Sequence, residues 1–242
     1  MDRKTSNTAS LTPDLSMRVA AVTAPVRNQV LHILRTAITS GRFQPGQRLV
    51  EKDLCEMIGV SRPSIREAMR QLESEKLIEI VPHRGPSVAR LSANDVRSIY
   101  QVRGALEALA ASLFAADATD EEIADLKEAV ADVRAAYDSG DVGRMLERKQ
   151  VFYDILIDGS RNTIIRSTLS TLNDRINNLR RLSLGSPDRT RKSIVEIETI
   201  LEAITKRDAK KAFAASEAHV KEAAKAALRS IEQIEQNKEA GI

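Results

Sequence analysis

The stretch GVSRPSIREAMRQLE, Gly59 to Glu73, has the pattern of a helix but carries three arginines, Arg62, Arg66 and Arg70. Arg62 and Arg66 lie at its leading end, where the helix dipole disfavours positive charge. Such charge is useful where that end enters the major groove of DNA, because arginine can pair with guanine edges and with phosphates. The arginines therefore predict a DNA-reading helix.

The surrounding segments have the pattern needed to position that helix. Residues 25–41 predict one helix and residues 50–59 a second, each ended by a glycine, and Ser61 is the expected N-cap of the third. The runs LIEIV and SVARL are strand-like and flank PHRGP, which predicts a two-stranded wing. Three helices followed by a β-ribbon make a winged helix-turn-helix. The expected inward residues are Val26, Val30, Ile33, Leu34, Ala37 and Ile38 in the first helix, and Ile65, Ala68, Met69 and Leu72 in the third.

Charge is distributed unevenly along the 242 residues. Residues 1–91 carry 14 Lys and Arg against 9 Asp and Glu, a net +5, whereas residues 92–242 carry 23 against 25, a net −2. A basic front part joined to a near-neutral remainder indicates a polyanion-binding module attached to another domain.

Other features narrow the class of protein. The single Cys55 excludes an intrachain disulfide and a cysteine-cluster metal site, and it fits a reducing, cytoplasmic compartment. No apolar run approaches the roughly 18 residues that span a membrane, so no membrane partner is expected. We expect residues 1–20 to form a disordered tail because they are polar and rich in Ser and Thr.

After Leu91 the strand signals stop and capped helical segments follow one another to about residue 236. Ser92 and Thr119 are expected N-caps, and Gly140 is an expected stop. The fold class is therefore mostly α. We expect a winged helix-turn-helix over residues 21–91, called the head below, and an all-α antiparallel bundle over residues 92–236, called the bundle.

The head resembles the GntR family of bacterial transcription regulators, through the blocks SGRFQPGQRL, GVSRPSIREAMRQLE, KLIEI and HRG in that order. The bundle resembles the FCD effector-binding domain of the FadR subfamily, through DVRSIYQVRGALEALAA, DGSRNTII and ILEAITKRDAKKAFAASEAHV. The resemblance implies a homodimeric regulator, expected to be a repressor. It would bind a palindromic operator in double-stranded DNA, and a small metabolite in the bundle would control it.

Residue positions carry over from this resemblance. The implied DNA contacts are Lys52, Ser61, Arg62, Ser64, Arg66 and, at the wing tip, His83, Arg84 and Gly85.

The bundle departs from the family where many relatives hold a divalent metal with one Asp and three His. Lys149 stands in place of the Asp, while Tyr153 and Ile197 replace two of the histidines, so only His219 remains. One imidazole cannot hold a metal that requires three or four ligands, and a lysine repels it. We expect no metal and no other cofactor.

The same substitutions suggest a pocket for an organic anion. Lys149 would supply the positive charge that the metal provides elsewhere. Arg103, Tyr153, Asn173 and His219 would complete the lining.

Each of these residues also has a simpler interpretation. Lys149 can be solvated, Tyr153 can fill the core, and His219 can be a core histidine with a hydrogen bond. Arg103 can pair with Glu107 on the helix surface.

Two other functions compete with a ligand-responsive regulator. An enzyme is not predicted, because the sequence has no nucleophile elbow, phosphate loop, HExxH or Cys–His arrangement. A ligand-independent DNA-binding protein, whose bundle serves only dimerisation, stays open. A polar-lined cavity would favour the sensor, and a sealed apolar bundle would favour the alternative.

Overall fold

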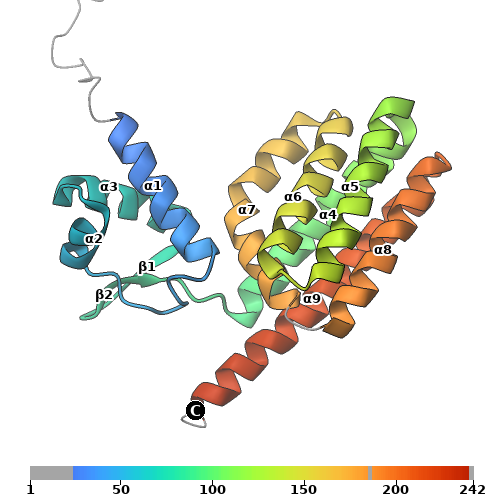
Figure 1. Ribbon diagram of the computed structural model, residues 1–242. Helices are drawn as coiled ribbons and strands as arrows, with labels where there is room; N and C mark the ends of the chain where they lie inside the picture. Colours follow the sequence, from blue (N-terminus) through green and yellow to red (C-terminus); the bar gives the residue numbers. More distant parts are fainter. Residues whose placement is uncertain (1–23, 185–186, 240–242) are drawn as a thin grey trace, which may run out of the picture.

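The computed structural model describes residues 24–184 and 187–239. The predicted tail, residues 1–20, lies outside this range. The described part is mostly helical, with one small sheet, and it forms a head and a bundle side by side (Figure 1). No helix in residues 24–184 or 187–239 is long and apolar enough to cross a membrane.

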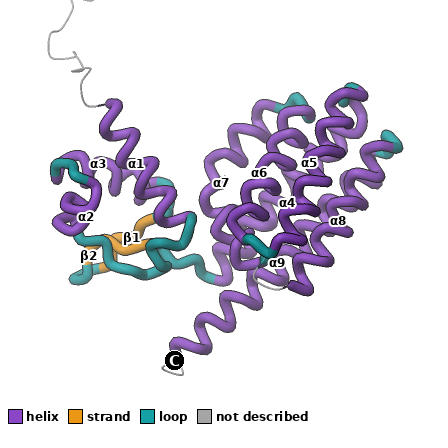
Figure 2. Tube along the Cα trace, in the orientation of Figure 1, coloured by secondary structure: helices purple, strands orange, loops and turns teal. Residues whose placement is uncertain are grey.

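The head contains three helices and a wing, as predicted. Its elements are α1 (Ala24–Thr39), α2 (Glu51–Ile58), α3 (Arg62–Ser74), β1 (Ile78–Val81) and β2 (Gly85–Val88). The strands are antiparallel, with Ile78 opposite Val88 and Val81 opposite Gly85. They form the only sheet of the described chain (Figure 2).

The head has its own core, to which each helix contributes one face. All four residues of the stripe predicted for α3, Ile65, Ala68, Met69 and Leu72, are buried. The prediction for α1 is wrong at Val26 and Ile33, which are 43% and 46% exposed. Each lies at the edge of the α1 stripe, where helical spacing alone does not show how far the neighbouring elements reach.

The bundle consists of six helices joined by short loops, and the N-terminal parts of its first two are held by capping boxes. The helices are α4 (Ala93–Asp117), α5 (Asp120–Ser139), α6 (Val142–Gly159), α7 (Thr163–Ser183), α8 (Pro187–Thr205) and α9 (Ala209–Glu239). Ser92 and Thr119 each accept a hydrogen bond from the backbone amide at N3, and the Asp95 and Glu122 carboxylates accept one from the N-cap amides. The C-terminal end of α9 projects beyond the other bundle helices (Figure 1).

Head and bundle have separate hydrophobic cores but touch through α1 and α7. One ion pair joins head and bundle, and a second joins α7 to the start of α4, close to the segment that links the two parts. Arg35 Nε of α1 lies 2.7 Å from Asp174 Oδ2 of α7, and Arg175 of α7 lies 3.4 Å from Asp95 near the start of α4. Helix α7 is therefore the part of the bundle that faces the head.

Candidate nucleic-acid interface and effector cavity

The leading end of α3 presents the predicted DNA-contacting side chains to solvent. Ser61 and Arg62 are exposed, and Ser64 is half-buried. Ser61 stands at the N-cap position, but its hydroxyl makes no capping hydrogen bond and instead lies 3.1 Å from the Ser64 hydroxyl. Both hydroxyls therefore lie at the surface, beside the positive end of the helix dipole, where a phosphate is favoured.

Arg66 is exposed but already has a partner on the neighbouring helix. Its Nε donates to both carboxylate oxygens of Glu51, at 2.8 and 2.9 Å. The hydrogen bond from Arg66 lowers the pKa of Glu51, so this carboxyl is ionised at neutral pH. To contact DNA, the Arg66 guanidinium has to leave the Glu51 carboxylate and pair with a guanine or a phosphate instead. Lys52, next to Glu51, is 70% exposed and has only a loose contact with Glu56, at 3.9 Å.

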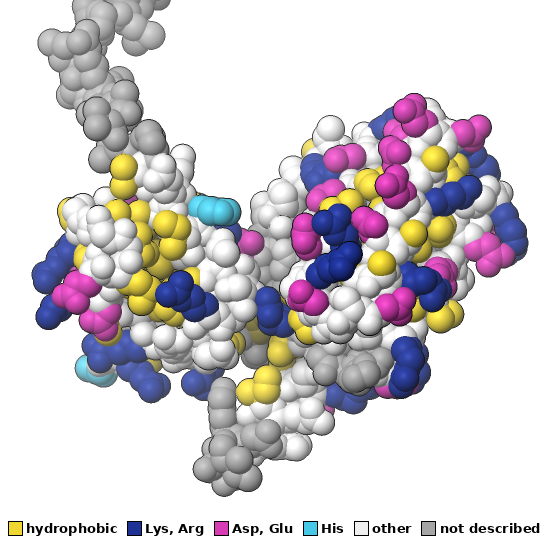
Figure 3. Space-filling model, viewed as in Figure 1, with side chains coloured by type: hydrophobic (Ala, Val, Ile, Leu, Met, Phe, Trp, Pro, Cys, Tyr) yellow, Lys and Arg dark blue, Asp and Glu magenta, His cyan; other side chains and the backbone are white. Residues whose placement is uncertain are grey.

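The wing tip is a tight turn between β1 and β2. His83 and Gly85 both have positive φ, 62° and 80°, and the Arg84 amide donates to the Val81 carbonyl at 3.0 Å. His83 and Arg84 are exposed at the end of the ribbon, and Gly85 is half-buried. The space-filling view shows Lys and Arg side chains gathered at the outer edge of the head, over α2, α3 and the wing (Figure 3).

In the bundle, Lys149 of α6 is inside the core. It is 2% exposed, so the interpretation as a solvated lysine is wrong. Its Nζ has one long hydrogen bond, 3.4 Å to the Ser193 hydroxyl of α8. Burial, and next the charges of Arg103, Arg180 and Arg189, hold the pKa of the Lys149 ammonium well below its ordinary value. The side chain is an amine kept away from water.

Tyr153 lies one turn from Lys149 and accepts a hydrogen bond from a buried arginine. The Arg103 Nη2 donates to the Tyr153 hydroxyl at 3.0 Å, and the Arg103 Nε donates to Glu107 at 2.7 Å. The Arg103–Glu107 pair expected on the surface therefore exists, but both side chains are 1% exposed. The Arg180 guanidinium lies over the Tyr153 ring, 4.2 Å from its centre.

His219 of α9 is a core histidine with a hydrogen bond. Its Nδ1 lies 2.6 Å from Glu196 Oε2, and Arg189 donates to both oxygens of the same carboxylate at 2.8 and 3.0 Å. Burial holds the pKa of His219 well below its ordinary value, so the ring is neutral and Nδ1–H donates to Glu196. Its Nε2 is buried without a hydrogen-bond partner in the described part of the chain.

These side chains come from α4, α6, α7, α8 and α9 and form one group, called the cationic cluster below. Its members are Arg103, Glu107, Lys149, Tyr153, Arg180, Arg189, Glu196 and His219. Four of them are basic Lys or Arg side chains, and two are carboxylates. Buried charges normally occur in balanced pairs. With Lys149 as a neutral amine, the three arginine cations still exceed the two carboxylates by one, and this excess favours an anion.

Sequence reasoning had identified only part of this cluster. Arg180, Arg189 and Glu196 were not predicted, because long charged side chains on helices are ordinarily solvated. One signal was present: Arg180 follows Ile176 by four residues on the apolar stripe of α7, and both are buried.

A cavity of about 120 Å³ adjoins the cluster. Tyr153, Arg180 and Glu107 line one part of it, and Asn173 and Ile176 of α7 line another. The predicted Asn173 therefore lines the same cavity as Tyr153. Arg103, Lys149 and His219 are not on the cavity wall.

The matches to family models cover both parts of the chain. Residues 26–88 match the model described as bacterial regulatory proteins, gntR family, and residues 98–222 match the FCD domain. The chain is 33% identical over 185 residues to an uncharacterized HTH-type transcriptional regulator, YdhC, of Bacillus subtilis, a match that covers 76% of this chain and 83% of YdhC.

The chain belongs to the GntR family, with an FCD domain. A second relative, the HTH-type transcriptional repressor RspR of Escherichia coli, is 27% identical over 200 residues, 83% of this chain and 88% of RspR. A solved structure of a putative GntR regulator from Rhodococcus sp. RHA1 has the same fold, with a TM-score of 0.71 at 21% identity over 84% of this chain and 97% of that one. This GntR-family chain is a DNA-binding transcription regulator and not an enzyme.

The residues of this GntR-family chain do not fit a metal ion in the bundle. Of the positions where FCD relatives hold a metal, His219 keeps a possible ligand, and it bonds to Glu196. Lys149 replaces a carboxylate ligand by a buried lysine side chain among arginines, and Ile197 brings a hydrocarbon side chain. Within the described residues, no three His, Cys, Asp or Glu side chains come together as metal ligands.

Proposed function

We propose that this protein is a cytoplasmic repressor that binds a palindromic operator as a homodimer and responds to a small organic anion in the bundle, without a metal. The repressor role is supported by the name of RspR. The dimer and the palindrome are supported by the single recognition helix of each chain. Two such helices, from two chains, can read two half-sites about one DNA turn apart.

On the DNA, the proposed contacts have different tasks. Arg62 and Arg66 would select bases, because a guanidinium can pair with guanine through two hydrogen bonds. Lys52, Ser61, Ser64 and the wing residues His83, Arg84 and Gly85 would bind the backbone or the minor groove and fix the position of α3. Arg66 would leave Glu51 as it does so.

In the bundle, the observation that carries the proposal is the excess of buried cations. A carboxylate entering from the cavity beside Tyr153 and Arg180 would compensate it, and a small movement of Tyr153 would open the way to Lys149 and His219. Anion binding would also favour the protonated forms of Lys149 and His219, since a nearby negative charge raises the pKa of both. The effector would act by preferring one arrangement of the heads over the other.

A thermal-shift screen tests the effector proposal. We expect one class of small mono- or dicarboxylates to raise the melting temperature, because a ligand that binds only the native state stabilises it. The rise should be the same with and without a chelator. The methyl esters of the same acids serve as uncharged controls and should not bind. About one tightly bound metal ion per chain, or destabilisation by the chelator, would contradict the metal-free site.

The alternative is a ligand-independent DNA-binding protein whose bundle only dimerises. The small cavity volume favours it, since ligand pockets commonly have about 300–1,000 Å³, against about 120 Å³ here. Absence of any carboxylate-dependent shift, together with operator binding that no metabolite changes, would support this alternative.

A further inference from the structure

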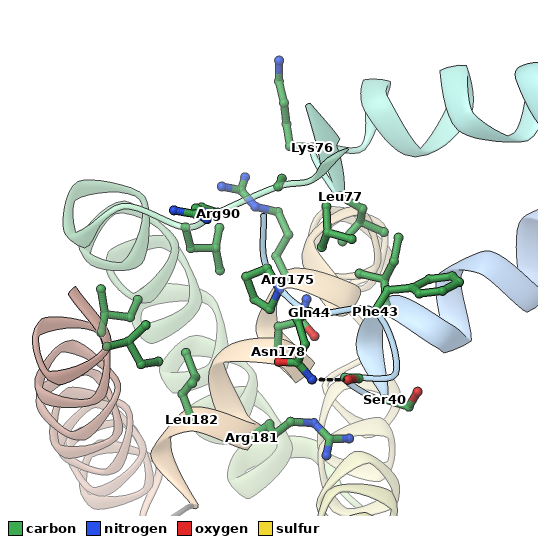
Figure 4. Close-up of a pocket in the computed structure, with 18 residues that line it drawn as sticks. Ser40, Phe43, Gln44, Lys76, Leu77, Arg90, Arg175, Asn178, Arg181 and Leu182 are labelled. Carbon is green, nitrogen blue, oxygen red and sulfur yellow. Dashed lines mark hydrogen bonds between the residues drawn. The ribbon is translucent and has the colours of Figure 1, made fainter. Parts of the chain in front are cut away.

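A second and larger cavity, called the interdomain groove below, lies between the head and the bundle. Its volume is about 660 Å³, within the range of small-molecule sites. Its walls come from the loop after α1 and the strand-to-helix segment of the head, and from α7 and α9 of the bundle (Figure 4). The interdomain groove and the cavity beside Tyr153 have no lining residue in common, although α7 contributes to the walls of both.

The floor of the interdomain groove is apolar on both sides. The head contributes Phe43 and Leu77, which are 6% and 3% exposed. The bundle contributes Leu182, Ile231 and Ile234, and Ile234 is 41% exposed although it lines the groove. Ile234 and the half-buried Leu182 still meet water, and a hydrocarbon chain in the groove would cover them.

Positive charge lies around this apolar floor. Arg90, Arg175 and Arg181 line the groove, and no Asp or Glu is among its described lining residues. Arg175 reaches towards Arg90 (Figure 4) and has Asp95, outside the groove, as a partner at 3.4 Å. Arg90 and Arg181 form no ion pair with any residue in 24–184 or 187–239, and the Arg181 Nε is buried without a hydrogen-bond partner there. The charge therefore favours an anion.

We propose that the interdomain groove binds an aliphatic carboxylate of medium chain length. Its hydrocarbon chain lies between Phe43 and Leu77 of the head and Ile231 and Ile234 of the bundle. Its carboxylate pairs with Arg181, whose buried Nε has no hydrogen-bond partner in residues 24–184 or 187–239. This site is separate from the proposed effector site in the bundle core, and neither proposal depends on the other.

Because the groove lies between head and bundle, a ligand bound in it would affect the orientation of the head. Because the two walls belong to different domains, the groove has this shape only at the present orientation of head and bundle. A bound carboxylate stabilises that orientation because it binds this orientation more tightly than any other. If DNA selects a different orientation, DNA and carboxylate oppose each other by reciprocal linkage.

Isothermal titration calorimetry with octanoate on the full chain tests the proposal. We expect octanoate to bind more tightly than 1-octanol, which lacks the charge, and octylamine, which has the same chain and the opposite charge, not to bind. Arg181→Gln and Ile234→Asp are each expected to weaken octanoate binding by about tenfold or more, because one removes the charged partner and the other places a carboxylate on the apolar floor.

Matched controls separate the groove from general surface effects and from the core site. Arg191→Gln removes an exposed arginine of α8, and Ile164→Asp alters an isoleucine that is 71% exposed on α7. Neither residue lines the groove, so both variants should bind octanoate like the parent chain, as should Lys149→Met.

Circular dichroism of each variant verifies its fold. No octanoate binding, equal binding by groove and control variants, or a loss only in Lys149→Met would overturn the proposal. The core effector is tested independently by the short carboxylates, whose binding Ile234→Asp should leave unchanged.

Discussion

At the scale of single residues, Lys149 has surroundings that oppose its charge. Its amine is buried near three arginines, with one long hydrogen bond to Ser193. Such a group destabilises the ligand-free protein, because taking an ammonium or an amine out of water without full hydrogen bonding costs free energy. This cost in stability supports the proposed role of Lys149 in ligand binding.

Replacing this lysine should separate stability from ligand binding. We expect Lys149→Met to unfold at a higher urea concentration than the parent chain, by about 1–4 kcal/mol in free energy, because it removes the desolvated amine and keeps the volume. The same variant should lose the stabilisation by small carboxylates. A variant that is less stable than the parent chain and still binds the acid would show that Lys149 serves the packing alone.

The lowered pKa of Lys149 also predicts how stability depends on pH. Between the lowered native pKa and the ordinary value near 10.4 in the unfolded chain, the unfolded state binds one more proton than the native state. The free energy of unfolding should therefore rise with pH in this window, by up to about 1.4 kcal/mol per pH unit. Urea unfolding at about pH 7 and about pH 9 measures it. In Lys149→Met the rise should be smaller by this amount, and an equal rise would mean that Lys149 is charged in the native protein.

Arg66 supports a third prediction at this scale. Arg66→Ala should weaken binding to the specific operator by about 1–3 kcal/mol at fixed salt, with a smaller effect on non-specific DNA. Arg191→Ala removes an equally charged, exposed arginine from α8 and is the control. A gel-shift titration measures both. Similar affinities for Arg66→Ala and the control would remove Arg66 from the proposed base contacts.

At the scale of the elements, the helices and the wing could be predicted from local signals, and the cationic cluster only in part. Caps such as Ser92 and Thr119 and the stop at Gly140 act within a few residues, so they are visible in the sequence. Lys149 and His219 could be predicted as site residues because they occupy positions at which many relatives hold a metal. Arg189 and Glu196 could not be predicted, because the burial of Arg189 and the contacts of Glu196 depend on how α8 packs against α9, which no local pattern contains.

The turn between α2 and α3 gives a prediction for an element. Gly59 has φ 74° at the C-cap of α2, and a Cβ there would meet nothing within 4 Å. Gly59→Ala should therefore destabilise the head through backbone strain alone, by about 1–2 kcal/mol. Gly59→Asn is the control and should cost less, since Asn adopts this conformation more readily. Thermal unfolding checks both, and equal losses would point to a cause other than backbone conformation.

At the scale of the whole molecule, the head is held to the bundle by few contacts. Arg35 joins Asp174 of α7 and also pairs with Glu75 of the head. Burial raises the pKa of Asp174, so its carboxylate is poorly solvated and relies on Arg35. The orientation of the head therefore depends on a small number of partly buried charges.

Removing one of these charges should loosen the connection. We expect Asp174→Asn to increase hydrogen exchange in residues 89–92, which connect β2 to α4, without lowering the melting temperature of the bundle. Asp132→Asn is the control, because Asp132 pairs with Arg148 within the bundle. Unchanged exchange in Asp174→Asn would mean that apolar contacts hold the head.

Helix α7 has two occupied faces: Asn173, Ile176 and Arg180 meet the cavity beside the cationic cluster, while Asp174 and Arg175 face the head and the segment that leads to α4. A substitution that reshapes one face displaces the other, because both belong to the same rigid helix. If the bundle binds a metabolite as proposed, the choice of metabolite and the strength of the response to it are therefore inherited together during evolution. The preferred operator, which depends on α3, can diverge independently of both.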